Sequence, residues 1–102
     1  MSSFAVSRSA RVDVKNIAAY TQKTWGLNQR RDYIKGLDLA FHFLAENPLA
    51  GITCDYIFSG LRKYRYERHI IFYENRNKSV FIVRVLHSSM DVEPQFIIFN
   101  SR

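Results

Sequence analysis

The sequence predicts an α+β fold of two layers, in which an antiparallel helical hairpin packs on a small antiparallel β-sheet. Two amphipathic segments occupy the first half of the chain, and three short runs rich in Val, Ile, Phe and Tyr occupy the second half. A helical hairpin must bury its apolar stripe, and the sheet offers the only large apolar face for it. We therefore expect helices on one sheet face and an open opposite face, in a single domain that spans residues 1–102.

The first helix is predicted between Ser9 and Trp25. Ser9 is a favourable N-cap residue, and apolar side chains from Val14 onward recur at helical spacing. Gly26 follows as the stop, because glycine readily adopts the left-handed conformation common after a helix. The brief apolar segment around Phe4 is expected to join the sheet as an N-terminal edge strand.

The second helix is predicted from Asn28, which can cap it, to Asn47, which precedes Pro48. Its apolar residues repeat at steps of three and four, and the residue before a proline avoids the α conformation. Gly36 costs this helix about 1 kcal/mol relative to alanine, unless close packing requires the missing side chain. The hairpin side chains expected in the core, rather than in a binding groove, are Trp25, Phe41 and Leu44.

A meander of three strands is predicted after a connecting loop at Leu49–Ser59. Short runs of β-branched and aromatic residues favour strand over helix. Asn75–Lys78 joins the last two strands, and asparagine tolerates the left-handed conformations that a tight connection needs. The apolar tail Phe96–Phe99 is expected to pack on the domain or on a partner. The three predicted strands are Leu61–Tyr66, His69–Tyr73 and Val80–Leu86.

The composition indicates a basic protein without a cofactor. The formal net charge is +6 and the sequence pI is about 9.8, which suggests an acidic or polyanionic partner. Cys54 is the only cysteine, so we expect no internal disulfide, a reducing compartment and a partly buried structural thiol. No signal peptide, membrane-spanning run, phosphate-binding motif or metal-ligand spacing is recognisable. We expect a soluble cytoplasmic protein with no metal, no cofactor and no membrane partner.

Positive charge on the predicted strands has two interpretations. As a structural feature, cations on an open sheet face keep it soluble and oppose pairing of its edge with another chain. As a functional feature, cations interleaved with Tyr64, Tyr66 and Tyr73 could bind phosphates and stack on bases, or receive a peptide rich in Asp and Glu. Composition leaves both open. The strand cations are Arg62, Lys63, Arg65, Arg68, Arg76, Lys78 and Arg84.

A catalytic interpretation depends on two histidines. His69 and His87 fall on adjacent predicted strands, where they could act as general acid and base. With no carboxylate or tyrosine beside them in the sequence, such histidines are more often structural, so the residues alone favour binding over catalysis. The basic residues that could stabilise a developing phosphate charge are Arg65, Arg68 and Arg84.

Four short motifs occur in the second half of the chain. Gly60-Leu61-Arg62 opens the first meander strand, Arg68-His69 precedes an apolar and aromatic strand, and Leu86-His87 runs into Met90-Asp91. This pattern resembles the signature region of the ParE branch of the ParE/RelE toxin superfamily. The predicted helical hairpin, with Trp25-Gly26 at its turn, fits the same family, so the resemblance covers nearly the whole chain.

The resemblance implies the toxin of a bacterial type II toxin–antitoxin system of the plasmid-stabilisation kind. Such a toxin inhibits DNA gyrase by binding, without being an enzyme and without direct sequence-specific DNA binding. A ParD-like antitoxin would neutralise it in a hetero-oligomer that holds two or more toxin copies. The residues expected to contact the antitoxin or the target are Arg62, Tyr64, Arg65, Arg68, Arg84, Phe96 and Phe99.

Two alternatives stay open. The RelE branch uses the same fold to cut messenger RNA on the ribosome, and that activity would require His87 with Arg68, Arg84 or His69. Ser88 follows His87 where a tyrosine would support cleavage, and no tyrosine occurs after Tyr73, which favours the gyrase-directed branch. The other alternative is a degenerate, non-toxic family member that survives only as an antitoxin partner.

Overall fold

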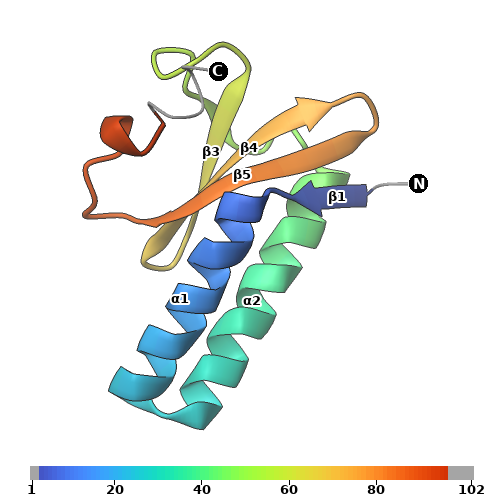
Figure 1. The fold of residues 1–102 in the computed structure, drawn as a ribbon. Helices are drawn as coiled ribbons and strands as arrows, with labels where there is room; N and C mark the ends of the chain where they lie inside the picture. The colour runs from blue at the N-terminus through green and yellow to red at the C-terminus, as the bar shows by residue number, and fades with distance from the viewer. Residues whose placement is uncertain (1–2, 97–102) are drawn as a thin grey trace.

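A computed structural model describes residues 3–96, and in these residues two helices pack on one face of a five-stranded sheet (Figure 1). The strand order is β1-β5-β4-β3-β2. This arrangement confirms the predicted two-layer α+β fold. The elements are β1 (Ser3–Val6), α1 (Arg8–Trp25), α2 (Leu27–Glu46), β2 (Ile52–Thr53), β3 (Leu61–Tyr66), β4 (His69–Arg76), β5 (Ser79–His87) and the 3₁₀ helix η1 (Glu93–Phe96).

The sheet is mixed rather than purely antiparallel. Strands β3, β4 and β5 form the predicted antiparallel meander, in which Tyr66 lies opposite His69. Strand β1 joins the edge as predicted, but it runs parallel to β5, with Phe4 opposite Val80. Both helices and the strands β2, β3 and β4 lie between β1 and β5 in the chain, so the connection is long enough for the crossover that a parallel pair requires (Figure 1).

The β4–β5 connection is shorter than the predicted Asn75–Lys78 link. Strand β4 continues to Arg76, and Arg76 lies opposite Ser79, the first residue of β5. Asn77 and Lys78 have φ angles of 30° and 67°. Positive φ at both central residues is the property of the two-residue hairpin turn whose twist matches that of the strands.

Helix α1 begins two residues earlier than predicted, because Ser7 and not Ser9 is its N-cap. The Ser7 Oγ accepts a hydrogen bond from the Ala10 N–H at 2.9 Å and donates one to the Val83 carbonyl at 2.7 Å. The second bond fastens the start of the helix to β5. Ser9 instead lies within the first turn of the helix.

Helix α2 begins at Leu27, directly after Gly26, and the predicted Asn28 cap is wrong. Gly26, with φ of 100°, ends α1 and also occupies the N-cap position of α2. The helix ends before Asn47 and Pro48, as predicted. A Cβ atom on Gly36 would overlap the side chain of Tyr66, so close packing does require the missing side chain.

The core between the helices and the sheet contains two of the three hairpin residues predicted for it. Phe41 and Leu44 are buried, whereas Trp25 is 58% exposed, so its prediction as a core residue is wrong. Trp25 is the last residue of α1, at the hairpin tip, where the hairpin extends past the sheet (Figure 1). The buried cluster includes Ala10, Ile17, Leu37, Phe41, Leu44, Ile71, Tyr73, Val80, Ile82 and Val85.

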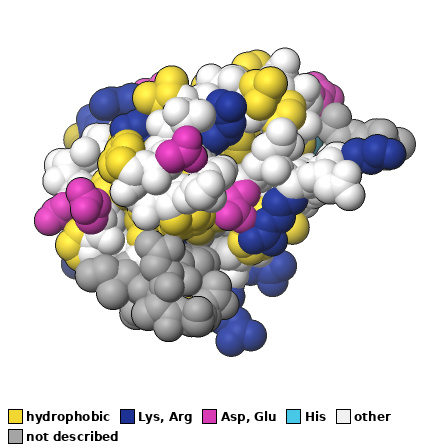
Figure 2. Space-filling model, turned by 90° about the horizontal axis from the view of Figure 1, so that it is seen from above, with side chains coloured by type: hydrophobic (Ala, Val, Ile, Leu, Met, Phe, Trp, Pro, Cys, Tyr) yellow, Lys and Arg dark blue, Asp and Glu magenta, His cyan; other side chains and the backbone are white. Residues whose placement is uncertain are grey.

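The opposite sheet face is not the open cationic surface that the sequence led us to expect. A second buried cluster covers it, with Phe72 and Phe96 at a ring-centroid distance of 5.1 Å. The predicted Leu49–Ser59 loop contributes Cys54 to this cluster and also contains β2. Seen from above, Lys and Arg side chains are scattered among apolar and acidic ones (Figure 2). The buried members are Cys54, Leu61, Phe72, Val83, Leu86 and Phe96.

Candidate functional site

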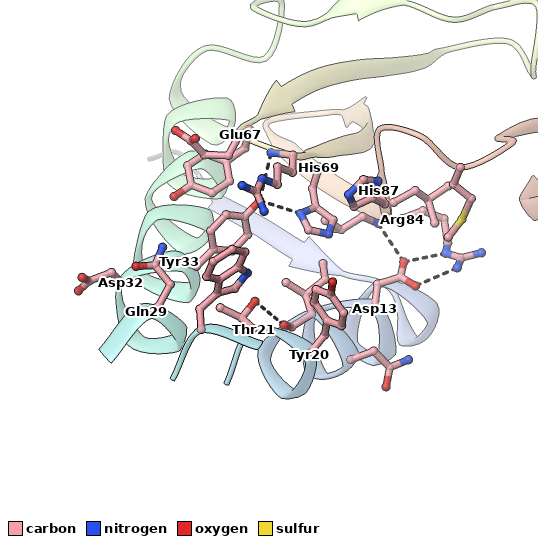
Figure 3. A pocket seen from close by; sticks show the side chains of 18 residues that line it. Asp13, Tyr20, Thr21, Gln29, Asp32, Tyr33, Glu67, His69, Arg84 and His87 are labelled. Atoms are coloured by element: carbon pink, nitrogen blue, oxygen red, sulfur yellow. Dashed lines mark hydrogen bonds and ion pairs between the residues drawn. The ribbon is translucent and has the colours of Figure 1, made fainter. Parts of the chain in front are cut away.

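A cleft of about 950 Å³ lies where the helical hairpin meets the adjoining ends of β4 and β5 (Figure 3). It brings together the four side chains named above for the nuclease alternative: Arg68, His69, Arg84 and His87. We call this site the histidine cleft. The grouping follows from strand register, because His69 begins β4 directly opposite His87, which ends β5.

His69 is an uncharged side chain held in a hydrogen-bond chain. Its Nδ1 lies 2.7 Å from the Tyr33 Oη, and that oxygen accepts a hydrogen bond from the Arg68 N–H at 3.3 Å. The Tyr33 hydroxyl can therefore give its own proton to His69 Nδ1. Burial first, and the neighbouring His87 second, lower the pKa of His69 from 6.5 to about 4. The imidazole is consequently neutral at physiological pH, and its Nδ1 is already occupied.

His87 lies beside His69 but is exposed. The two rings have centroids 5.3 Å apart and meet edge to face. The Ser89 N–H donates to His87 Nδ1 at 3.1 Å, so in the neutral ring the proton is on Nε2. His87 is therefore the histidine of the cleft that solvent and a ligand can reach.

The charge of Arg84 is neutralised within the protein. Its Nε and Nη2 each bind a carboxylate oxygen of Asp13 at 2.8 Å, and its Nη1 binds the Gln95 carbonyl at 3.2 Å. The Val85 N–H also donates to the Asp13 carboxylate, at 2.9 Å. The Asp13 hydrogen bond raises the pKa of Arg84. Asp13 thus links α1 to the edge of β5 beyond the end of β1, and Arg84 is its ion-pair partner in this link.

Arg68 is the exposed cation of the cleft. Its guanidinium lies over the ring of Trp25, with the central carbon 5.5 Å from the ring centroid. This cation–π contact also connects the tip of the hairpin to the β3–β4 turn. A ligand in the cleft would meet Arg68 and Trp25 together with the two histidines, because all four residues line it.

Three tyrosines line the histidine cleft, namely Tyr20, Tyr33 and Tyr66. Nothing in the sequence connects Tyr33 with His69, because the two residues are 36 positions apart. Burial is the main reason that the pKa of Tyr33 is raised, so the phenol keeps its proton. The cleft thus does contain a tyrosine bonded to a histidine, but this tyrosine comes from α2 and its partner is His69.

The remaining predicted binding residues on β3 do not gather in the cleft. Arg62 is partly buried and donates to the Gly51 carbonyl at 2.6 Å. Arg65 is exposed, with its Nε bonded to the Glu67 carbonyl at 2.9 Å. The Tyr64 ring packs against Phe43 at a centroid distance of 5.6 Å.

Phe96 and Phe99, the predicted contacts from the tail, cannot be treated alike. Phe96 is 1% exposed and packs against Phe58 and Phe72, so in this structure it is a core side chain. The prediction that the tail packs on the domain is therefore confirmed for Phe96. Phe99 lies outside the described residues.

Within residues 3–96, no group of three or more His, Cys, Asp or Glu side chains is placed to hold a metal ion. In the same part of the chain, no helix combines the length and the apolar character that crossing a bilayer demands. Cys54 is a free thiol that is fully buried, whereas the sequence led us to expect a partly buried one.

The architecture matches a solved structure described as the chromosomal ParDE TA system from P. aeruginosa. The TM-score is 0.72 at 17% sequence identity, over 85% of this chain and 95% of that chain. This similarity shows that the two chains share a fold.

Sequence comparison identifies the family. Residues 4–92 match the model of the ParE toxin of type II toxin-antitoxin system, parDE. Toxin ParE1 of Caulobacter vibrioides is 33% identical, over 89% of this chain and 94% of its own length. Toxin ParE1 of Mycobacterium tuberculosis is 34% identical, over 90% and 95%. Toxin ParE of Escherichia coli is 32% identical, over 90% of each. The chain belongs to the ParE family of type II toxins.

Proposed function

We propose that this chain inhibits DNA gyrase by binding to it, is not an enzyme, and is neutralised by a ParD-like antitoxin. The observation that carries the proposal is the family match over residues 4–92. The antitoxin complex would be a hetero-oligomer with two or more toxin copies. Its site of action would be the cytoplasm, where gyrase and the chromosome are located, and the toxin itself would not read DNA sequence.

The electrostatics of the histidine cleft support a binding role over catalysis. A general base must be free to take a proton, yet the Nδ1 of His69 is occupied by Tyr33. A phosphate-stabilising cation must be free to face the substrate, yet Arg84 is neutralised by Asp13. Arg68 is left as the exposed cation of the cleft, over Trp25. This set is better suited to hold a partner than to cleave a phosphodiester.

The direct test is supercoiling of relaxed plasmid by gyrase in the presence of purified toxin. We expect inhibition that rises with toxin concentration, and release of that inhibition when the antitoxin encoded beside the toxin is added. A control reaction uses toxin that has been unfolded by heat. Uninhibited supercoiling by folded toxin would reject the gyrase target.

A second candidate function, cleavage of messenger RNA, has one observation in its favour. The cleft places Tyr33, His69 and His87 together, and His87 has an accessible Nε2. His87→Ala separates the two functions, with His42→Ala as matched control, because His42 is an exposed histidine on α2 outside the cleft. A nuclease would lose toxicity by orders of magnitude in the first variant only. A binding inhibitor would keep most of its toxicity in both.

A further inference from the structure

The histidine cleft has two sides of opposite hydrogen-bonding character. The carboxylates of Asp32 and Glu67 lie on the left of Figure 3, whereas His87 lies on the right, and all three residues line the cleft. The cleft volume of about 950 Å³ falls in the range of small-molecule sites, which is about 300–1,000 Å³. A ligand that fits both sides therefore carries donors at one end and acceptors at the other.

The two histidines supply the donors. The Nδ1 of His69 takes the proton of the Tyr33 hydroxyl, and the Nδ1 of His87 accepts the Ser89 N–H. Each neutral ring therefore carries its proton on Nε2. The ring centroids are 5.3 Å apart, so the two N–H groups belong to adjacent rings of the cleft wall. An anionic oxygen, such as that of a phosphate group, is the natural acceptor for such a pair.

The two carboxylates supply the acceptors. Neither Asp32 nor Glu67 takes part in any of the ion pairs found within residues 3–96. Burial first, and the charge of Glu67 second, raise the pKa of Tyr66, so Glu67 lies close to that ring. The Tyr66 ring is in turn 5.2 Å from the ring of Tyr33, measured between centroids. An ionised carboxylate only accepts hydrogen bonds, so this side of the cleft favours a ligand with adjacent N–H donors.

Trp25 supplies an exposed aromatic face in the same cleft. Its side chain is 58% exposed, and the guanidinium of Arg68 lies over its ring. Nucleobases stack on aromatic rings and on arginine guanidinium planes. Among the bases, guanine presents two adjacent donors, N1–H and N2–H, to a carboxylate, whereas adenine presents an acceptor at N1. The cleft thus combines a stacking surface, a guanine-type acceptor and a phosphate-type donor pair.

We infer that the histidine cleft binds a guanine mononucleotide. The base stacks on Trp25 and donates N1–H and N2–H to the carboxylate of Glu67. The phosphate accepts the Nε2–H groups of His69 and His87. A free nucleotide fits better than a nucleic acid strand, because the additional phosphates of a strand would meet the unpaired carboxylates of the cleft. This inference goes beyond the proposed function and depends on neither gyrase nor the antitoxin.

The fluorescence of Trp25 provides the test, because Trp25 is the only tryptophan of the chain. Folded toxin is titrated with guanosine monophosphate (GMP), adenosine monophosphate (AMP), guanosine and inorganic phosphate, and titration calorimetry checks each affinity. We expect saturable quenching by GMP. AMP lacks the donor pair and guanosine lacks the phosphate, so each should bind at least about 10-fold more weakly than GMP. Inorganic phosphate should displace GMP only weakly.

Two variants with matched controls assign the two ends of the nucleotide. Glu67→Gln should weaken GMP binding about 10-fold and leave AMP binding within about threefold, whereas Glu46→Gln, at an exposed position of α2 outside the cleft, should change neither. His87→Ala should bring the affinity for GMP close to that for guanosine, whereas His42→Ala should leave it unchanged. Circular dichroism confirms that each variant is folded.

Four outcomes would overturn the inference or a part of it. Absence of saturable quenching and of heat on mixing would reject the site. Equal affinity for GMP and AMP would reject the guanine assignment, and unchanged GMP binding in both cleft variants would place the nucleotide elsewhere. A uridine oligonucleotide with one guanosine that binds more tightly than GMP would reject the free nucleotide. Because the assay contains no gyrase, none of these results bears on the proposed function.

Discussion

The ion pair between Asp13 and Arg84 gives the sharpest stability prediction, because it joins residues 71 positions apart. The side chains are 11% and 16% exposed, respectively. Asp13→Ala would leave a largely buried guanidinium and the Val85 N–H without their acceptor. Removing one partner of a buried pair costs about 3–5 kcal/mol, and the residual solvent access here lowers our expectation to about 2–4 kcal/mol. Total stability of such a domain is about 5–15 kcal/mol.

The measurement is urea unfolding followed by circular dichroism, for the parent, Asp13→Ala, Arg84→Met and the double variant. The double variant has no unpaired guanidinium, because Arg84 is absent. Its loss of unfolding free energy should therefore be smaller than the sum of the two single losses, by at least about 1 kcal/mol. Arg84→Met also removes the hydrogen bond to the Gln95 carbonyl, so this variant should loosen η1 and expose Phe96 to solvent. A loss below 1 kcal/mol in Asp13→Ala, or strict additivity, would refute the reasoning.

Three further predictions concern single positions. Because the pKa of His69 is lowered to about 4, the unfolded chain binds the extra proton between about pH 6.5 and 4. The unfolding free energy should therefore fall as pH falls through that window, by at most about 1.4 kcal/mol per pH unit, and His69→Asn should flatten the profile in urea titrations. Gly36→Ala should lower stability by about 1–3 kcal/mol through overlap with Tyr66, despite alanine's higher helix propensity, and adding Tyr66→Leu should recover part of the loss in thermal melts. Ser7→Ala should cost about 1 kcal/mol, whereas Ser9→Ala should be neutral or stabilising; equal effects would contradict the assigned cap.

Local pattern in the sequence was sufficient for most elements. The strands β3, β4 and β5 and both helices lie close to their predicted ranges, because hydrophobic periodicity reports directly on a helix or a strand that packs on a core. The cap of α1 was misplaced because two serines stand near the same helix start. The choice between them depends on the Val83 carbonyl, which only the folded sheet brings to Ser7.

The second apolar cluster had a signal in the sequence that was not used. A strand with one solvated face alternates apolar and polar residues, but Ile70 to Tyr73 and Phe81 to Val83 are continuous apolar runs. Such runs indicate burial on both faces, as the structure shows. The two-residue strand β2 had no usable signal, because two residues cannot display a period.

The strand residues of the histidine cleft could be predicted from the sequence, whereas their partners on the helices could not. Placing His69 and His87 on adjacent strands followed from the meander, and the register then set them opposite each other. Tyr33 and Asp13 were not predictable as their partners, because those contacts depend on how the helix layer lies over the sheet. These two helix residues decide the chemistry, since one occupies the Nδ1 of His69 and the other neutralises Arg84.

The cations most available to a binding partner are those that have no hydrogen-bond acceptor or ion-pair partner within the protein. On the sheet, Arg62 bonds the Gly51 carbonyl, Arg65 bonds the Glu67 carbonyl and Arg84 pairs with Asp13. The sequence assigned partner binding to these residues, yet a partner would have to displace an internal bond from each. Arg11, Lys15, Arg31 and Lys35, which line a groove between α1 and α2, have no ion pair within residues 3–96. The net charge of the chain is +6, and these cations of the helix layer lack an internal ion pair in that part of the chain. Salt-sensitive association should therefore depend mainly on these cations.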